Sequence, residues 1–336
     1  MALKMSDIAK MANVSKSAVS IAINGKEGIS EETRQKILRI IDEQGYTPLR
    51  KSHRAASSDI GEITFLVVTT SGVVQDNYRS LPFFNSLISA LSADVSQQNG
   101  SLRTVTVDAD DLANKLDGVA STSQNGVLVL GTDLTRNQAL LIRRRLNHVV
   151  FLDTYFEDVM ADFVTMDNYQ GAQLAGRYML QQGYENIGYF ASDKLMSNFK
   201  ERRRGFREAL AETGIKVAQD HFFLTSPTSQ DPTGVDLKAM GDNLPDAIFC
   251  EDDYIAIRLI KAAQHAKIRV PDDLAIMGFD DIYESALITP ELSTIHVPVE
   301  QMAKQALHQL RGQLESRSWN PQKTLVATTL VKRQSL

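Results

Sequence analysis

The stretch that decides the fold is ANVSKSAVSIAING, residues 12–25, which contains one charged residue, Lys16, and no aromatic residue. Ser15 is placed to cap a helix, because its hydroxyl can accept a hydrogen bond from a free backbone N–H of the first turn. Asn24 and Gly25 are typical of a helix end. The stretch therefore predicts a small, polar helix.

Two further segments with helical patterns flank this helix. The first begins near Ser6 with SDIAKMA, and Asn13 ends it; the third begins at Ser30, with acidic residues in its first turn, and ends at Gly45. The inner faces are predicted to hold Ile8, Met11 and Ala12 in the first helix and Ile37, Leu38 and Ile41 in the third. Two helices joined by a tight turn, with a third behind them, make a helix-turn-helix pattern.

The charge of the chain changes sign along its length. The 336 residues carry a net charge of −5, but residues 1–60 hold 10 Lys and Arg against 7 Asp and Glu, whereas the remainder holds 26 against 34. This asymmetry marks a domain boundary and assigns any contact with a polyanion to the N-terminal end.

From Ile63 onward the pattern is that of an α/β protein. Continuous apolar runs such as ITFLVV, GVLVLG, HVVFLD and DAIFCED alternate with amphipathic segments. Such runs predict parallel sheets covered by helices on both faces. About ten strands exceed one compact sheet, so we expect two lobes with a ligand cleft between them. The predicted boundaries are residues 1–49 for the helical N-terminal unit, 50–60 for a linker and 61–336 for the two-lobed domain.

Composition excludes several classes of protein. No apolar run is long enough to span a bilayer and no leader precedes the first helix, so a cytoplasmic protein without a membrane partner is expected. The single cysteine, Cys250, lies in the apolar run AIFC and is expected to be a buried hydrophobe. No Cys/His cluster has metal-ligand spacing, and neither a metal nor another cofactor is expected.

The second helix is the candidate for reading DNA. In a helix-turn-helix the second helix enters the major groove with its first residues at the base edges, so it must stay slim. Lys16 and Ser17 are predicted to read bases, and Ala18 can touch a thymine methyl. Ser15, Ser20 and Asn24 are predicted to hold phosphates. The alternative is a small helical hairpin with an exposed polar face.

Residues 5–48, MSDIAKMANVSKSAVSIAINGKEGISEETRQKILRIIDEQGYTP, fit the pattern D-I-A-x-x-A-x-V-S-x-x-x-V-S, N-G, V/I-S-x-x-T-R-x-x-I/V and G-Y-x-P. In this the chain resembles the lactose-repressor/galactose-repressor (LacI/GalR) family of transcriptional regulators, and the similarity continues through VPDDLAIMGFDD and PELSTIHVP. The resemblance implies a DNA-binding headpiece (1–49) and a hinge linker (50–60) that folds on the operator. It also implies a two-lobed effector-binding and dimerisation domain (61–336) like periplasmic sugar-binding proteins. It also implies a homodimer that reads pseudo-palindromic operator DNA.

The chain departs from the family pattern at two places. Where the family usually has a base-reading arginine this chain has Ile21, which cannot donate to guanine, so an operator that differs at that base is predicted. In the hinge, Ala55 replaces the leucine that wedges into the minor groove and is too small to fill an opened base step. Arg50, Lys51 and Arg54 remain as phosphate contacts, which predicts salt-sensitive, less selective binding by the hinge.

The ligand is expected to be a carbohydrate. Four strand-end or loop residues match positions that contact the effector in the resembled family: Asp153, Arg202, Asp252 (where asparagine is common) and Asp280. Carboxylates and an arginine can hold sugar hydroxyls by charge-assisted hydrogen bonds. The candidate stacking faces are Phe83, Tyr155, Phe199 and Tyr254. Each of these residues has an ordinary structural alternative as a cap, a surface ion pair or part of the core.

The function predicted is that of a transcriptional regulator, a repressor, whose operator affinity a small ligand controls; no enzyme activity is expected. Three alternatives stay open. The chain could be a plain carbohydrate-binding protein, which leaves the headpiece unexplained. It could be a glycosidase with Asp153 and Asp280 as the acid/base pair. It could be regulated through a phosphoprotein partner, as in the catabolite-control branch of the family, although no feature of the sequence supports this.

Overall fold

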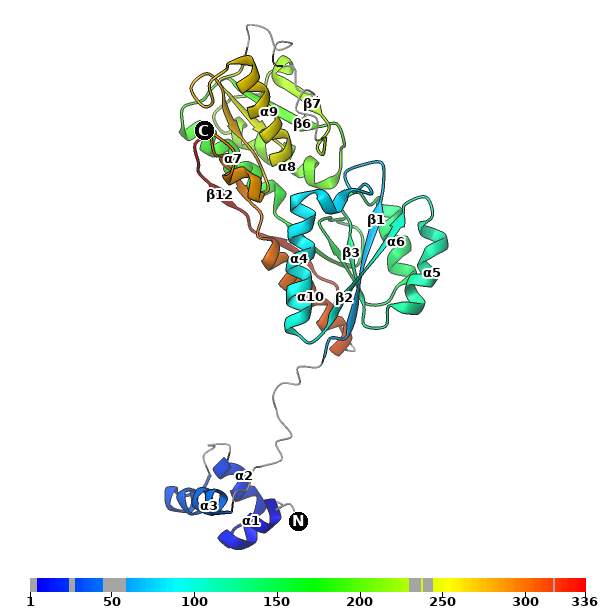
Figure 1. The fold of residues 1–336 in the computed structure, drawn as a ribbon, viewed down its shortest axis with the longest axis vertical. Helices are drawn as coiled ribbons and strands as arrows, with labels where there is room; N and C mark the ends of the chain where they lie inside the picture. The colour runs from blue at the N-terminus through cyan, green and yellow to red at the C-terminus, as the bar shows by residue number, and fades with distance from the viewer. Residues whose placement is uncertain (1–4, 24–27, 45–58, 230–236, 238–243, 317) are drawn as a thin grey trace. The chain divides into compact units, whose positions relative to one another are not determined.

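The computed structural model describes residues 5–23, 28–44, 59–229, 237, 244–316 and 318–336. The chain forms two compact units, residues 1–57 and 58–336, which are described separately below (Figure 1).

The N-terminal unit contains three short helices, α1 (Met5–Ala12), α2 (Lys16–Ile23) and α3 (Glu31–Glu43). Serines cap two of them as predicted: Ser15 Oγ accepts from the N–H of Ala18 at 3.1 Å, and Ser30 Oγ accepts from the N–H of Thr33 at 3.2 Å. The helices share one small core, made of Ile8, Ala9, Ala12, Val19, Ala22 and Ile37. The helix-turn-helix prediction is therefore confirmed.

Two residues predicted for this core are exposed. Met11 is 47% exposed and Leu38 is 37% exposed, whereas Ala9 and Ile40 pack against the core. The buried positions on α3, Ile37 with Ile40 and Ile41, follow the three- and four-residue spacing of one helix face. Leu38 lies one position off that face, so the prediction of its burial was wrong.

The first lobe of the larger unit is a six-stranded parallel sheet in the order β11-β5-β4-β3-β1-β2. Its strands are β1 (Glu62–Thr69), β2 (Ser101–Asp108), β3 (Val127–Leu130), β4 (Val149–Leu152), β5 (Asp162–Met166) and β11 (Lys323–Val326). Helices α4 (Pro82–Gln97) and α10 (Val299–Glu315) cover one face, and α5 (Leu112–Thr122) and α6 (Arg136–Arg145) cover the other. Alternate residues of β1 point to the two faces: Phe65 and Val67 to one core, Leu66 and Val68 to the other.

The second lobe has a four-stranded parallel sheet in the order β7-β6-β8-β9. Its strands are β6 (Ile187–Ser192), β7 (Phe222–Thr225), β8 (Ala247–Cys250) and β9 (Ala275–Met277). Helices α7 (Asn168–Gln181) and α8 (Ser197–Ala211) pack on one face and α9 (Asp253–Ala266) on the other. A Cβ on Gly205 of α8 would lie 2.2 Å from the carbonyl oxygen of Tyr169, so glycine permits the close approach of α8 to α7.

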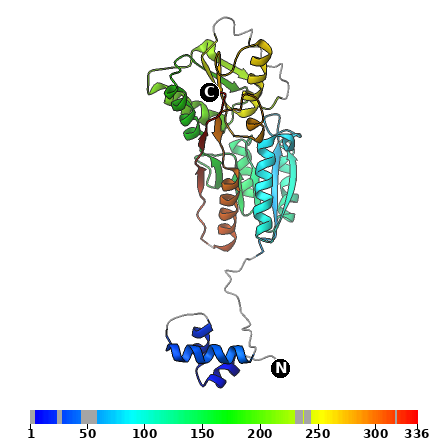
Figure 2. The same cartoon turned by 60° about the vertical axis from the view of Figure 1, so that its left-hand side comes forward.

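Three segments connect the two lobes. The chain passes from β5 to α7, from β10 (Thr294–His296) to α10, and from β11 to β12 (Thr329–Val331), which pairs antiparallel with β10. In Figure 2 the C-terminal strands run from the first lobe to the second. The carboxyl ends of β1, β3 and β4 and those of β6, β8 and β9 lead into the loops that line the region between the lobes.

Every apolar run predicted as a strand forms one, and Cys250 is fully buried in β8 as expected. The short β7, which is partly exposed, was not predicted. None of the helices in the described ranges has the length and apolarity that crossing a membrane requires. Among the same residues no cluster of His, Cys, Asp or Glu has a metal-binding arrangement.

Candidate ligand cleft and nucleic-acid interface

Seven of the eight residues predicted to bind ligand lie around one cavity between the lobes. Asp153 follows β4 in the first lobe, Arg202 lies on α8, Asp252 follows β8, and Asp280 follows β9 in the second lobe. All four line the cavity, together with three of the aromatic candidates: Phe83, Phe199 and Tyr254. Residues from separate parts of the sequence therefore converge as the strand-end argument predicts.

Arg202 is held firmly within this cavity and is 3% exposed. Its Nε donates to Asn168 Oδ1 at 2.8 Å, its Nη1 donates to the carbonyl oxygen of Glu251, and its Nη2 forms an ion pair with Asp280 Oδ1 at 3.0 Å. The guanidinium also stacks 3.7 Å from the centre of the Phe279 ring. Three directional donors and a ring face fix the orientation of this charge.

Asp153 joins the two lobes. Its Oδ1 accepts from Asn198 Nδ2 on α8 at 2.7 Å, and its Oδ2 accepts from Thr132 Oγ1 at 2.5 Å. Burial raises the pKa of Asp153 to about 6, although these hydrogen bonds and Arg202 oppose the shift. The backbone of Asp153 has a φ of 58°, a strained conformation for a residue other than glycine.

Asp252 and Asp280 bring two further buried carboxylates to the cavity. Asp252 caps α9, since its Oδ1 accepts from the N–H of Ile255 at 2.7 Å, and burial raises its pKa to about 7. Burial also raises the pKa of Asp280 well above its usual range, with Arg202 opposing and the neighbouring carboxylates adding to the shift. Asp280 has a φ of 121°, so strain again marks a strand-end carboxylate of this cavity.

The aromatic candidates divide into two groups. Tyr254 accepts from the N–H of Phe83 at 3.0 Å, a second hydrogen bond across the lobes, and Phe199 lies beside Arg202 with its ring centre 5.5 Å away. Tyr155 does not line the cavity: its ring packs edge-on against Phe163 at 6.3 Å between centroids and lies 5.6 Å from Lys323 Nζ. The structure thus places Tyr155 against the first-lobe core and not at the inner cavity.

Sequence reasoning missed several residues of this cavity, including Thr132, Met196, Asn198 and Thr228. Asn198 lies four residues before Arg202, on the same face of α8, so helical spacing from the arginine would have found it. Asn168 acts within the second lobe: its Oδ1 accepts from Arg202 Nε, which orients the guanidinium, and its Nδ2 donates to Asn198 Oδ1 at 3.1 Å.

Three further carboxylates near the cavity are bonded within the protein and have structural roles. Asp253 is fully buried and accepts hydrogen bonds from Thr294 and Ser285. Asp281 pairs with Arg333 and His296. Asp167 caps α7 by accepting from the N–H of Gln170 at 2.9 Å.

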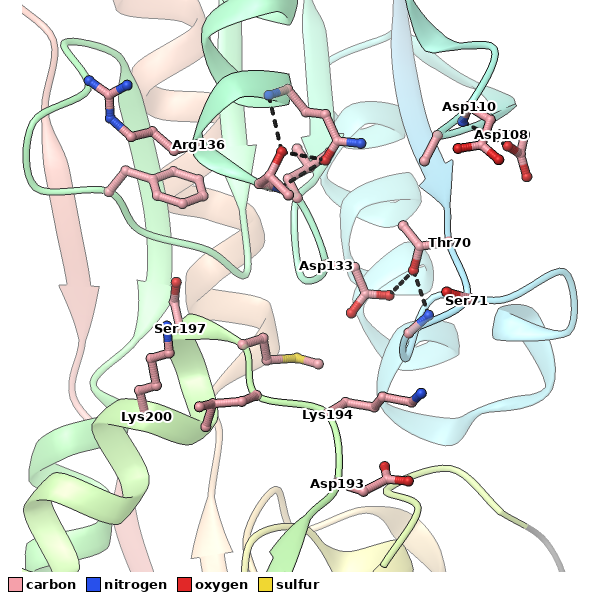
Figure 3. A pocket seen from close by; sticks show the side chains of 18 residues that line it. Thr70, Ser71, Asp108, Asp110, Asp133, Arg136, Asp193, Lys194, Ser197 and Lys200 are labelled. Atoms are coloured by element: carbon pink, nitrogen blue, oxygen red, sulfur yellow. Dashed lines mark hydrogen bonds between the residues drawn. The ribbon is translucent and has the colours of Figure 1, made fainter.

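A second, larger cavity opens beside the first and shares Met196 with it. Figure 3 shows the charged side chains that surround it: Asp108, Asp110, Asp133 and Arg136 come from the first lobe, and Asp193, Lys194 and Lys200 from the second. Its volume is about 890 Å³, whereas the inner cavity measures about 40 Å³ and has room for only a few water molecules. The inner cavity is therefore too small to hold a sugar as it stands, and a sugar-sized ligand requires the lobes to separate there.

The second helix of the N-terminal unit exposes the residues predicted to contact DNA. Ser15, Lys16 and Ser17 are exposed, while Ala18, Ser20 and Ile21 are partly buried. Val19 and Ala22 face the core, so α2 presents its hydroxyl-rich side outward. The remaining predicted contacts, Asn24, Arg50, Lys51, Arg54 and Ala55, lie outside the described residues.

Ile21 is partly withdrawn from that outward side. Its Cδ1 lies close to Gly28, 3.4 Å from where a Cβ on that residue would be. Its carbonyl oxygen accepts from Arg34 Nη1 at 3.5 Å, which ties the end of α2 to α3. The isoleucine therefore has a packing role within the unit in addition to any contact with a base.

Two family profiles match this chain. The profile of bacterial regulatory proteins of the lacI family matches residues 4–48, and that of the periplasmic binding protein-like domain matches residues 177–336. The chain belongs to the LacI family. This LacI-family chain is 29% identical to the ribose operon repressor of Haemophilus influenzae, over 99% of its own length and 98% of that protein. It is 28% identical to the repressor PurR of Mannheimia succiniciproducens, over 98% and 97% of the two chains.

The fold of this LacI-family chain is similar to that of a solved structure, the complex of the transcriptional regulator CelR with cellobiose. The TM-score is 0.71 at 22% identity, and the match covers 99% of both chains. The LacI-family chain is thus a DNA-binding transcriptional regulator with a separate ligand-binding domain. The relatives are named as transcriptional repressors, and neither name is that of an enzyme.

Proposed function

We propose that this LacI-family regulator is a cytoplasmic repressor that binds a pseudo-palindromic operator as a homodimer. Its affinity for the operator falls or rises when a sugar occupies the inner cavity. The observation that supports this most directly is the convergence of Asp153, Arg202, Asp252 and Asp280, from both lobes, on one small cavity. A ligand held by groups from both lobes changes their relative position, because it is bound best in one arrangement only.

The proposed parts follow the chain in order. Residues 1–49 form the headpiece, in which Lys16 and Ser17 read bases and Ser15 holds a phosphate. Residues 50–60 form the hinge, and residues 61–336 bind the effector and dimerise. Identity to the ribose operon repressor and likeness to the CelR–cellobiose complex support a carbohydrate as the effector class.

Two observations argue against the glycosidase alternative. Both oxygens of Asp153 accept hydrogen bonds, and one oxygen of Asp280 is paired with Arg202, so Asp153 lacks the free oxygen that one member of an acid/base pair requires. A function limited to carbohydrate binding does not explain the capped helix α2, whose polar side faces outward. We therefore propose that the chain has no enzymatic activity.

The experiment begins with selection of the preferred operator from random duplexes, followed by titration of the full-length protein by fluorescence anisotropy with and without sugars. Arg202→Ala should abolish the effect of ligand on operator affinity while leaving affinity itself unchanged. Arg204→Ala is the matched control, because Arg204 lies on the same helix but is exposed and pairs with Glu201.

Because Arg202 is buried, its removal could unfold the lobe. Asp153→Asn keeps the shape of the side chain and a route for hydrogen bonding, and it should weaken the ligand response without loss of fold. A ligand response that survives both Arg202→Ala and Asp153→Asn, in folded proteins, would refute the assignment of the cavity.

A further inference from the structure

The inner cavity carries an excess of negative charge. Asp153, Asp252 and Asp280 all line it, and Arg202 is the one cationic side chain among the described lining residues. The side chain of Asp280 is 8% exposed, and Asp252 and Asp153 are 4% and 2% exposed as residues. Water therefore screens these charges poorly, and whatever binds here meets a strongly anionic environment.

The cavity is also rich in acceptors and poor in donors. Arg202 already donates to Asn168, Glu251 and Asp280. The Nδ2 group of Asn198 donates to Asp153, and the hydroxyl of Thr132 does the same. Most of the polar hydrogens at the cavity wall are thus used within the protein.

Two carboxylate oxygens have no donor. In the described part of the chain nothing donates to Oδ2 of Asp252 or to Oδ2 of Asp280, although the other oxygen of each is hydrogen-bonded. Asp252 is the more informative of the two, because it is more than nine-tenths buried and lines the cavity with an oxygen that has no protein partner. This oxygen reaches the accessible space of the cavity and no described protein group donates to it, so it is free to accept a hydrogen bond from a ligand.

The titration of the cavity agrees with this reasoning. Burial raises the pKa of Asp153 to about 6 and that of Asp252 to about 7, and mutual repulsion adds to the shift at Asp280. These carboxyls therefore take up protons closer to neutrality than exposed aspartates do, which lowers the negative charge that they place at the cavity. A bound cation would offset that charge directly.

We propose that the effector is an amino sugar, a carbohydrate ring whose protonated amine binds between Asp252 and Asp280. The amine supplies the donors and the positive charge that these carboxylates lack, and the aromatic walls at Phe83, Phe199 and Tyr254 accommodate the ring. This inference rests on the proposed function, because it specifies the ligand of the same cavity.

The test is isothermal titration calorimetry of the full-length protein at pH 7 with three sets of matched sugars. Glucosamine, galactosamine and mannosamine are each compared with the parent hexose and with the N-acetylated form, which has the same ring but no charge; glucuronate and galacturonate supply the opposite charge. At least one hexosamine should bind about ten- to a hundred-fold more tightly than its parent and its N-acetyl form.

Asp252→Asn should remove most of that preference, since the amide keeps an oxygen for the cap of α9 but loses the charge. Asp193→Asn is the matched control, because Asp193 is exposed at the outer cavity and its removal changes the net charge equally. The melting temperature of each variant checks that it folds, and we expect it to equal or exceed that of the wild-type protein.

Three results would overturn the inference: equal or tighter binding of the neutral sugars, tighter binding of the uronates, or no binding of any hexosamine at millimolar concentration. The proposed function would survive each of them if another sugar altered operator affinity in the anisotropy titration. Failure of that titration with every sugar would refute the proposed function itself.

Discussion

Replacing Asp252 with asparagine should stabilise the regulatory unit, and the gain should depend on pH. The residue is 4% exposed, and the pKa of its carboxyl rises from 3.8 to about 7 because burial penalises the charged form. The native state therefore binds the proton more tightly than the unfolded state does. For a raised carboxyl pKa, stability falls as pH rises between the two pKa values, and the full penalty is present above about pH 7.

The magnitude follows from that interval. As pH rises from 5 to 8, ionisation of the buried carboxyl lowers the free energy of unfolding over about two pKa units of the shift. At 1.36 kcal/mol per unit this corresponds to about 3 kcal/mol. The amide does not titrate, and its oxygen can still accept from the N–H of Ile255. The difference in unfolding free energy between Asp252→Asn and the wild type should therefore be larger at pH 8 than at pH 5 by about 2 to 3 kcal/mol.

Urea denaturation followed by the fluorescence of Trp319 measures this difference. Trp319 is the single tryptophan of the chain, and its Nε1 donates to Asp162 at 2.9 Å, so its signal reports on the regulatory unit and not on the headpiece. The unfolding of the regulatory unit can therefore be followed in the full-length protein, and no truncated chain is needed.

Asp281→Asn provides a control of opposite sign. Burial opposes ionisation of Asp281, but the hydrogen bonds from His296 and Arg333 outweigh burial and hold its pKa below the ordinary value. Its carboxylate contributes stability above the unfolded pKa and loses it as pH falls through the folded pKa. Asp281→Asn should thus destabilise the unit at pH 8. If Asp252→Asn is no more stable than the wild type at either pH, the claim that ionisation of the buried Asp252 carboxyl destabilises the native state is refuted.

Three further predictions concern DNA binding and the headpiece. Lys16→Ala and Ser17→Ala should each lower affinity for the selected operator by about 1 to 3 kcal/mol and relax its sequence preference, and an unchanged preference in a repeated selection would exclude base reading. Ala55→Leu should tighten binding to a palindrome with a central CG step, because the larger side chain can fill an opened base step; an equal or weaker dissociation constant would refute this. Ser30→Ala removes the acceptor for the N–H of Thr33 and should lower headpiece stability by about 1 kcal/mol, whereas unchanged melting of the helical signal would show that the cap contributes nothing.

The sequence predicts the elements of this fold well because their signals are local. Ser15 and Ser30 cap helices where hydroxyls precede apolar periodicity, and each continuous apolar run is a strand buried on both faces. It predicts less well where local signals are weak. The partly exposed β7 has no such pattern, and Leu38 lies beside the correct face of α3.

The cavity was predictable in its charged groups but not in their partners. Strand ends brought Asp153 and Asp280 to the cleft, since carboxyl ends of parallel strands lie on one side of a sheet. Which donor each oxygen meets depends on tertiary packing across the lobes, as the hydrogen bond from Asn198 to Asp153 shows. Tyr155 was a candidate because an aromatic ring can stack on a sugar, yet its ring packs edge-on against Phe163, a contact that the sequence gives no local signal for.

The most direct test of the central claim is the dissociation constant of the full-length protein for its selected operator, measured with and without a sugar that raises the melting temperature of the regulatory unit. We predict one preferred duplex site and a ligand-induced change in affinity of about 5- to 150-fold. A protein that binds all duplexes alike at low salt, or whose affinity for the preferred site stays constant when the sugar is bound, would contradict it.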